Sequence, residues 1–145
     1  VISQTATVSD TYIVGGGTEL DNSVLCYPLA EAVFDVPDTL GAAPTTGKTV
    51  DLYLLKGDVD GTSDSTLFSY GALTNTDAKT DANGLQYCGS FVLYPTDERQ
   101  RHAITISLAG IKKCKFYIKN SSGTTLVYSS NPITVKVTPF TYGAA

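Results

Sequence analysis

Five segments of the chain alternate apolar and polar residues with a period of two, which is the pattern of half-buried β-strands. They are residues 49–57, 85–95, 101–110, 113–120 and 132–142. Because neighbouring side chains in a strand point to opposite faces, each segment predicts a strand with one face in a core. The residues expected on that face are Val50, Leu52 and Leu54; Leu85, Tyr87, Phe91 and Leu93; Ile104, Ile106 and Leu108; Cys114, Phe116 and Ile118; and Ile133, Val135 and Val137.

Weaker strand signals lie at residues 5–14, 24–29, 32–36, 67–73 and 124–129. Clusters of Gly, Pro, Asn, Asp and Ser separate the segments, and no stretch of a dozen residues has helical periodicity. The 20 Thr and 12 Ser also suit strands and turns. We therefore predict an all-β fold, a two-sheet β-sandwich that is jelly-roll-like and has about 8–10 strands.

The length of 145 residues fits one domain. Residues 1–17 are predicted to form an N-terminal strand or arm, because the alternating start runs into a glycine hinge at 15–17 that permits many exit directions. An ordinary first strand and an arm exchanged with a neighbouring copy both fit this pattern. Residues 18–145 are predicted to form the β-sandwich. No apolar run reaches the length of a membrane span, so no membrane partner is expected.

Charge is distributed unevenly along the chain. Residues 1–98 hold all 14 acidic residues and three lysines, a net charge of −11, whereas residues 99–145 hold seven basic residues and no acidic ones. Such polarity predicts either ion pairs formed as the strands fold or contacts between copies of the chain. Because the whole chain is acidic, no nucleic-acid partner is expected. The basic interface candidates are Arg99, Arg101, Lys112, Lys113 and Lys115.

Few residues suit catalysis or metal binding. Three cysteines and one histidine are too few for a usual zinc site, and the odd cysteine count argues against a closed disulfide framework. The segment containing Asp58, Asp60 and Asp64 resembles part of a Ca²⁺ loop, but it lacks the carboxylate six positions after the glycine. His102 has no nucleophile beside it in any known motif. We therefore expect no enzyme, no cofactor and no metal, with the three aspartates as the weak metal candidate.

Nine tyrosines and no tryptophan give the chain many side chains suited to polar contact surfaces. Tyr53, Tyr94 and Tyr117 fall on the outward-facing positions of their segments. They predict an interface or sugar-stacking patch, or else they pack against loops. Tyr53 and Tyr117 join the basic residues as interface candidates.

The order of motifs along residues 49–142 resembles a family of small virion proteins of tailed phages and prophages. In that family a D-L-Y-L-L strand is followed by a D-G turn, a G-S-F segment, a Q-R pair, a K-F-x-x-K-N strand and a closing strand before T-Y. The residues that carry the resemblance are Asp51, Tyr53, Leu54, Asp60, Gly61, Gly89, Ser90, Phe91, Gln100, Arg101, Phe116, Lys119, Asn120, Gly123, Val135, Thr141 and Tyr142.

This resemblance implies a virion protein made in the host cytoplasm. Compact β-sandwiches in virions are similar to capsid decoration (cement) proteins, commonly trimers that brace the major capsid protein, and this step is an analogy of fold. The expectation is thus a homotrimer on the capsid surface that stabilises the head. The alternative is a receptor- or glycan-binding sandwich on the tail or capsid.

Overall fold

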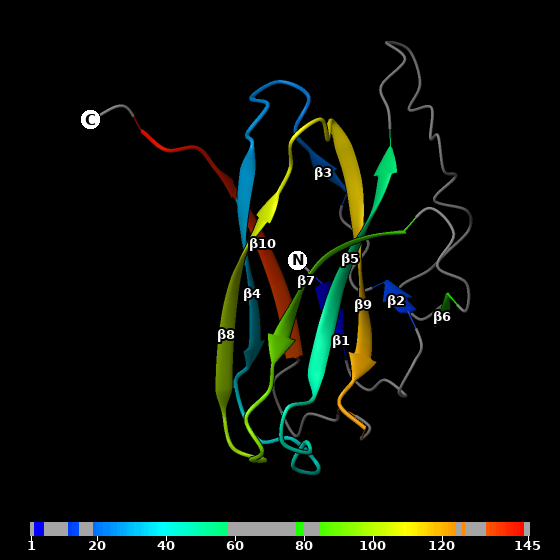
Figure 1. Ribbon diagram of the computed structural model, residues 1–145, viewed down its shortest axis with the longest axis vertical. Coiled ribbons are helices and arrows are strands. Elements are labelled where there is room, and N and C mark those ends of the chain that lie inside the picture. Colours follow the sequence, from blue (N-terminus) through cyan, green and yellow to red (C-terminus); the bar gives the residue numbers. More distant parts are fainter. Residues whose placement is uncertain are drawn as a thin grey trace.

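A computed structural model describes residues 2–4, 12–14, 19–57, 78–79, 85–123, 126 and 133–143. In that part of the chain every regular element is a strand, as Figure 1 shows. The strands are β1 (Ile2–Gln4), β2 (Tyr12–Val14), β3 (Leu20–Asp21), β4 (Leu29–Val36), β5 (Thr49–Gly57), β6 (Ala78–Lys79), β7 (Leu85–Val92), β8 (Gln100–Ser107), β9 (Lys113–Ser121) and β10 (Ile133–Phe140). Among the described residues no helix is long and apolar enough to cross a membrane.

The strands form two antiparallel sheets. Sheet A has the order β1-β10-β4-β8, and sheet B has the order β6-β2-β9-β5-β7, with β3 also paired to β9. When the two-residue strands β3 and β6 are set aside, the eight remaining strands follow the order first-eighth-third-sixth in sheet A and second-seventh-fourth-fifth in sheet B. This interleaved order is that of a jelly roll, so the predicted fold is confirmed.

The core lies between the two sheets. Phe34 of sheet A stacks on Phe91 of sheet B with ring centroids 5.5 Å apart, which joins the sheets at the centre of the sandwich. The inward residues predicted for β5, β9 and β10 lie in or against this core. Its buried members are Ala30, Ala32, Phe34, Val36, Leu40, Val50, Leu52, Leu54, Phe91, Leu93, Ile106, Leu108, Ile111, Cys114, Phe116, Ile118, Leu126, Ile133 and Val135.

The prediction for β7 is wrong at its first half. The register between β5 and β7 shifts between Leu52 and Tyr53, which leaves Cys88 as an extra residue in the ladder. Such a bulge reverses which face the following residues occupy. Phe91 therefore faces the core, whereas Tyr87 and Leu85 lie on the outer face of sheet B, opposite Tyr53 and Leu55.

The weaker predicted strands have mixed outcomes. The strand expected at 32–36 begins earlier, at Leu29, and residues 24–28 form a turn and coil rather than the expected strand. Part of the predicted 5–14 strand is β2, while β1 precedes it and joins the other sheet. The expected strand at 67–73, the glycine hinge at 15–17 and all of 124–129 except Leu126 lie outside the described residues.

Candidate functional site

A rigid turn at residues 22–27 stands at the end of the sandwich where β4 begins and β8 ends. Its centre is Asn22, a buried residue whose side-chain Nδ2 donates to Tyr27 O at 2.9 Å and to Ile111 O at 3.1 Å. The Oδ1 atom accepts from Tyr27 N at 2.9 Å. The backbone closes the turn, since Cys26 N donates to Asn22 O at 3.0 Å and Asn22 N donates to Lys112 O at 2.7 Å. One amide side chain thus ties the turn to the distant 108–112 segment.

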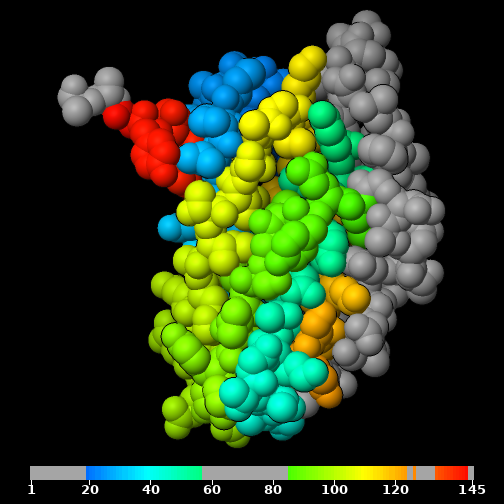
Figure 2. All heavy atoms as spheres, in the orientation of Figure 1, coloured from blue at the N-terminus to red at the C-terminus, as the bar shows by residue number. Residues whose placement is uncertain are grey.

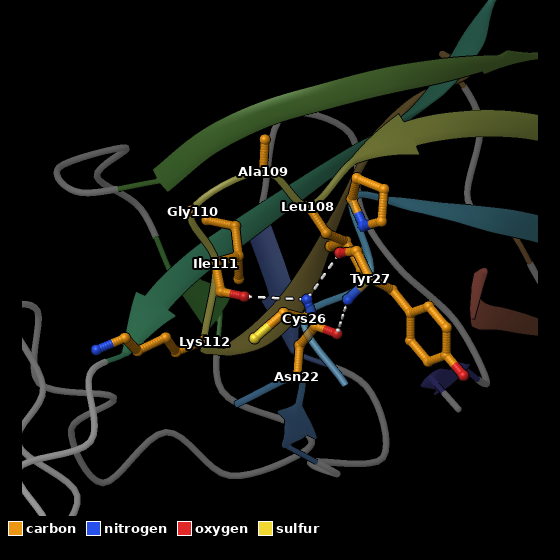
Figure 3. A pocket seen from close by; sticks show the side chains of 9 residues that line it. Asn22, Cys26, Tyr27, Leu108, Ala109, Gly110, Ile111 and Lys112 are labelled. Carbon is orange, nitrogen blue, oxygen red and sulfur yellow. Dashed lines mark hydrogen bonds between the residues drawn. The ribbon is translucent and has the colours of Figure 1, made fainter. Parts of the chain in front are cut away.

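This turn exposes two apolar side chains. Val24 is 86% exposed and Leu25 is 67% exposed. Beside them, the turn and the 108–112 segment enclose a mainly apolar pocket of about 260 Å³, shown in Figure 3. The pocket is lined by Asn22, Cys26, Tyr27, Pro28, Leu108, Ala109, Gly110, Ile111 and Lys112. The hydrogen bonds of Asn22 fix the backbone of the turn that carries the exposed apolar pair relative to the 108–112 segment.

The C-terminal segment leaves the sandwich at the same end. Phe140, the last residue of β10, lies opposite Leu29 at the start of β4. Tyr142 is 79% exposed and meets Phe140 edge to face, with ring centroids 5.8 Å apart. In Figure 2 this segment (red) stands out from the body of the molecule. Val24, Leu25 and Tyr142, which we call the apolar end, therefore gather three exposed apolar side chains at one end of the fold.

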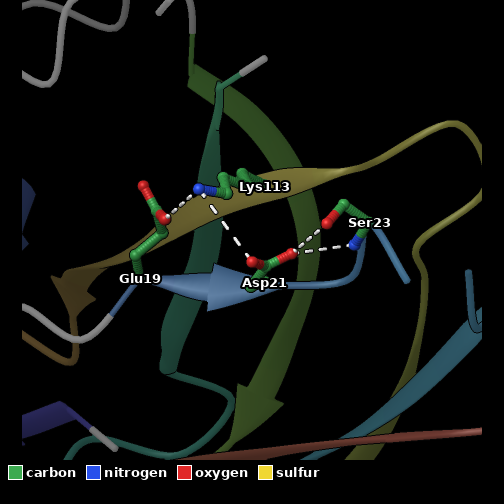
Figure 4. A network of polar contacts seen from close by, with 4 residues as sticks. All are labelled: Glu19, Asp21, Ser23 and Lys113. Carbon is green, nitrogen blue, oxygen red and sulfur yellow. Dashed lines mark hydrogen bonds and ion pairs between the residues drawn. The ribbon is translucent and has the colours of Figure 1, made fainter. Parts of the chain in front are cut away.

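Ion pairs next to the turn join the acidic and basic parts of the chain. Lys113 Nζ lies 3.3 Å from Glu19 Oε1 and 3.9 Å from Asp21 Oδ2, as Figure 4 shows. Asp21 Oδ1 also accepts from the hydroxyl and the backbone N–H of Ser23, at 2.6 and 2.9 Å. These hydrogen bonds lower the pKa of Asp21, with a smaller contribution from Lys113. Lys113 is thus engaged within its own chain.

Arg101 is engaged in the same way. Its Nε and Nη2 atoms each lie 3.2 Å from a carboxylate oxygen of Asp35, its partner across β4 and β8. Arg101 and Lys113 thus form ion pairs inside one chain, as one of the two predicted readings describes, and contacts between copies stay a prediction. The other basic interface candidates differ in exposure. Arg99 is exposed, Lys112 is exposed at the pocket, and Lys115 is half-buried.

The three tyrosines singled out by the sequence differ in exposure. Tyr117 is fully buried in a small cluster with Leu55, so it is not available as a surface contact. Tyr53 is half-buried and meets Tyr87 edge to face, with ring centroids 5.6 Å apart. Tyr94 is 59% exposed and lies against His102, with ring centroids 4.7 Å apart. The predicted patch is therefore not one surface.

His102 has a structural role in the 94–102 turn. Gln100 Nε2 donates to Thr96 O at 3.2 Å, so Gln100 Oε1 is the acceptor that receives Tyr94 N at 2.9 Å. The same oxygen lies 2.8 Å from His102 Nε2, which must then be the protonated nitrogen of the neutral ring. Partial burial lowers the pKa of His102. The imidazole therefore braces the turn as a donor to Gln100.

The remaining candidates for reactive or metal-binding groups are the cysteine thiols and the carboxylates. Burial raises the pKa of both Cys88 and Cys114 to about 12, and all three cysteines are free thiols. Among the described residues no group of three or more His, Cys, Asp or Glu is placed to hold a metal ion. The weak metal candidates Asp58, Asp60 and Asp64 lie outside the described residues.

Sequence reasoning missed the apolar end and the exposure of Tyr87. The apolar character of Val24 and Leu25 predicts a strand and gives no sign that the pair lies on a turn. The one available signal was Asn22, a residue type that favours turns. No protein-family model matches the chain, and no curated protein matches it either. Fold and surface chemistry must therefore support any function for the chain.

Proposed function

We propose that the chain is a non-enzymatic structural protein of a phage virion, a capsid decoration protein that binds the major capsid protein and stabilises the head. The observation that carries the proposal is the apolar end. Val24 and Leu25, at 86% and 67% exposure, sit on a turn with five hydrogen bonds to Asn22. Exposed apolar groups on a hydrogen-bonded turn favour binding to a protein surface, because little backbone conformational entropy is lost on contact.

Two further features support this proposal. The jelly roll is a fold used in viral capsid domains, an argument by analogy of fold. The sequence over residues 49–142 resembles small virion proteins of tailed phages. A pocket of about 260 Å³ is also smaller than the usual range for small-molecule sites, and it suits a single side chain of a protein partner.

The proposed mechanism is additive. Each copy places its apolar end on a capsid subunit and contacts neighbouring copies in a closed ring, expected to be a trimer. Linking several modest contacts raises the effective concentration of each one, so the ring dissociates slowly even when one contact is weak. The outcome is a brace across adjacent capsid subunits on the outer surface of the virion.

Mass spectrometry of purified particles tests the location directly. The particles are made from the genome that encodes this chain, and the amount of the chain is compared with that of the major capsid protein. We expect a fixed ratio between the two proteins in intact particles. Absence of the chain from particles in which all other structural proteins are detected would refute a virion role. Light scattering on the purified chain then gives the oligomeric state, expected to be three copies of 15.3 kDa.

A further inference from the structure

A chain of hydrogen bonds crosses the outer face of sheet B at its other end. Ser90 Oγ lies 2.6 Å from Asp51 Oδ1, Ser121 Oγ lies 2.8 Å from Asp51 Oδ2, and Tyr87 Oη lies 2.7 Å from Ser90 Oγ. These four residues come from β7, β5 and β9, and we call them the Tyr87 network. In β9, Ser121 is eight residues from Lys113, roughly 25 Å along the strand. The network is therefore separate from the apolar end.

The proton positions in the Tyr87 network follow from its chemistry. A carboxylate only accepts, so both serine hydroxyls donate to Asp51. Ser90 has one hydrogen and has given it to Asp51, so Tyr87 must donate its own hydroxyl hydrogen to Ser90 Oγ. Every hydroxyl hydrogen of the network then points along its hydrogen bond in the direction of Asp51. What the network presents outward is acceptor capacity, on the phenol oxygen of Tyr87 and on the carboxylate of Asp51.

An apolar surface adjoins these acceptors. Tyr87 is 57% exposed, and its ring is supported by an edge-to-face contact with the half-buried ring of Tyr53. Figure 2 shows β7 (green) uncovered on the face turned to the viewer. A ligand that suits this surface brings several hydrogen-bond donors on one side and an apolar C–H face on another.

A ligand with hydrogen-bond donors on one side and an apolar face on another is either cationic or neutral, and the charge of the site distinguishes the two classes. A cationic ligand would be favoured by a carboxylate whose charge is unbalanced. Lys119, however, lies directly opposite Asp51 in the β5–β9 register, on the same outer face. Within the described residues, Asp51 and Lys119 therefore place one charge of each sign on facing strand positions, which favours a neutral ligand. Polyhydroxyl compounds combine neutral charge, clustered O–H donors and an apolar face.

We infer that the outer face of sheet B around Tyr87 binds a neutral saccharide, with the exposed Tyr87 ring as the stacking surface and Asp51 and the Tyr87 hydroxyl as acceptors for sugar hydroxyls. Because this site is separate from the apolar end, the inference does not depend on capsid binding. A decoration protein with such a site would carry a saccharide-binding surface on the outside of the particle. The orientation of Tyr87 is set by Ser90, so the site is pre-formed.

Saturation-transfer NMR on the full chain tests the inference. The probes are a panel of neutral hexoses, deoxyhexoses, N-acetylhexosamines and their disaccharides, each at up to about 50 mM to detect a dissociation constant on the order of 1 mM. We expect at least one saccharide to receive saturation from tyrosine ring protons. Tyr87→Ala should weaken its binding at least tenfold, and Tyr87→Phe, which keeps the ring, should weaken it less.

Tyr94→Ala is the matched control, because Tyr94 is 59% exposed, close to the 57% of Tyr87, but lies outside the network. It should leave saccharide binding unchanged. Asp51→Asn provides a second variant with the same shape and weaker acceptors, and it should also weaken binding. Absence of binding by every saccharide, or equal binding by Tyr87→Ala, would overturn the inference. A change in solution mass of Tyr87→Ala would instead assign this face to contacts between copies and would also overturn it. Capsid binding by Tyr87→Ala should be unchanged.

Discussion

Lys113 Nζ lies 3.3 Å from Glu19 Oε1, and this contact joins the basic end of the chain to its acidic part across β9 and the segment before β3. The lysine side chain is only 13% exposed and Asp21 lies on its other side. Charge reversal at this position would place three carboxylates together. We therefore predict that Lys113→Glu lowers the free energy of unfolding by about 1–3 kcal/mol, measured by urea denaturation.

Lys136→Glu is the control for this prediction, since Lys136 is an exposed lysine on β10. It should change stability by less than about 0.5 kcal/mol. Equal effects of the two substitutions would show that the Lys113 pairs contribute nothing specific. A test of contacts between copies by charge reversal should therefore use Lys112 and Lys115 and leave Lys113 intact.

Gly89 and Ile104 show how closely the two sheets approach at their shared edge. A Cβ atom built on Gly89 would lie 2.7 Å from Ile104 Cδ1, shorter than any normal contact. Gly89→Ala should therefore destabilise the chain by about 1–3 kcal/mol, through this contact and through the φ of +157° at Gly89, which residues with a Cβ rarely adopt. Combining it with Ile104→Val removes the clashing methyl group and should restore part of the loss, measured as a coupling in a double-mutant cycle.

Gly143→Ala is the matched glycine control, because a Cβ there meets nothing within 4 Å. It should leave the unfolding midpoint unchanged. Strict additivity of Gly89→Ala and Ile104→Val would contradict the contact as the cause of the loss.

The hydroxyl of Tyr117 is buried and has no hydrogen-bond partner in the part of the chain that the structure describes. Burying an unsatisfied hydroxyl costs about 1–3 kcal/mol, and the same burial raises the pKa of this phenol. Tyr117→Phe removes the hydroxyl and keeps the ring. We predict a gain of about 1 kcal/mol, seen in calorimetry as a melting temperature about 3–5 °C higher. A lower melting temperature would mean that the hydroxyl makes a stabilising bond.

His102 gives the fold a dependence on pH with a defined sign. Burial lowers its folded-state pKa below the ordinary 6.5, so protonation favours the unfolded chain. The stability due to neutral His102 is present above about pH 6.5 and is lost as the pH falls through the folded-state pKa. The difference in stability between the native chain and His102→Gln should therefore shrink from pH 7.5 to pH 5.

NMR provides a direct check, since His102 is the sole histidine of the chain and its ring protons are easily assigned. The midpoint of its titration should lie below 6.5. A midpoint above 6.5 would contradict the burial of the ring.

The alternation of apolar and polar residues was sufficient to predict the core-facing side chains of strands that pair without a bulge. Val50, Leu52 and Leu54 face the core as their spacing indicates, because β5 keeps a period of two over these residues. In β7 the period breaks at Cys88, and the residues before it change face. Gly89 in the middle of a strand pattern is a known sign of such a bulge, but it does not say which residues move.

The 22–27 turn could not be predicted from the residues next to it in the sequence, for a different reason. Asn22 holds it by bonding Ile111, which is 89 positions away in the chain. Without that distant partner, Val24 and Leu25 look like strand residues, so their exposure could not be read from their neighbours. The Tyr87 network likewise depends on the pairing of three strands.

Co-sedimentation with capsids tests the central claim most directly. Capsids assembled from the major capsid protein of the same genome are mixed with the purified chain, and bound chain is measured against concentration. We predict saturable binding by the native chain and at least tenfold weaker binding by the double variant Val24→Ser, Leu25→Ser, which should remain folded because both side chains are exposed. Failure of the native chain to sediment with capsids, or equal binding by the double variant, would contradict the account.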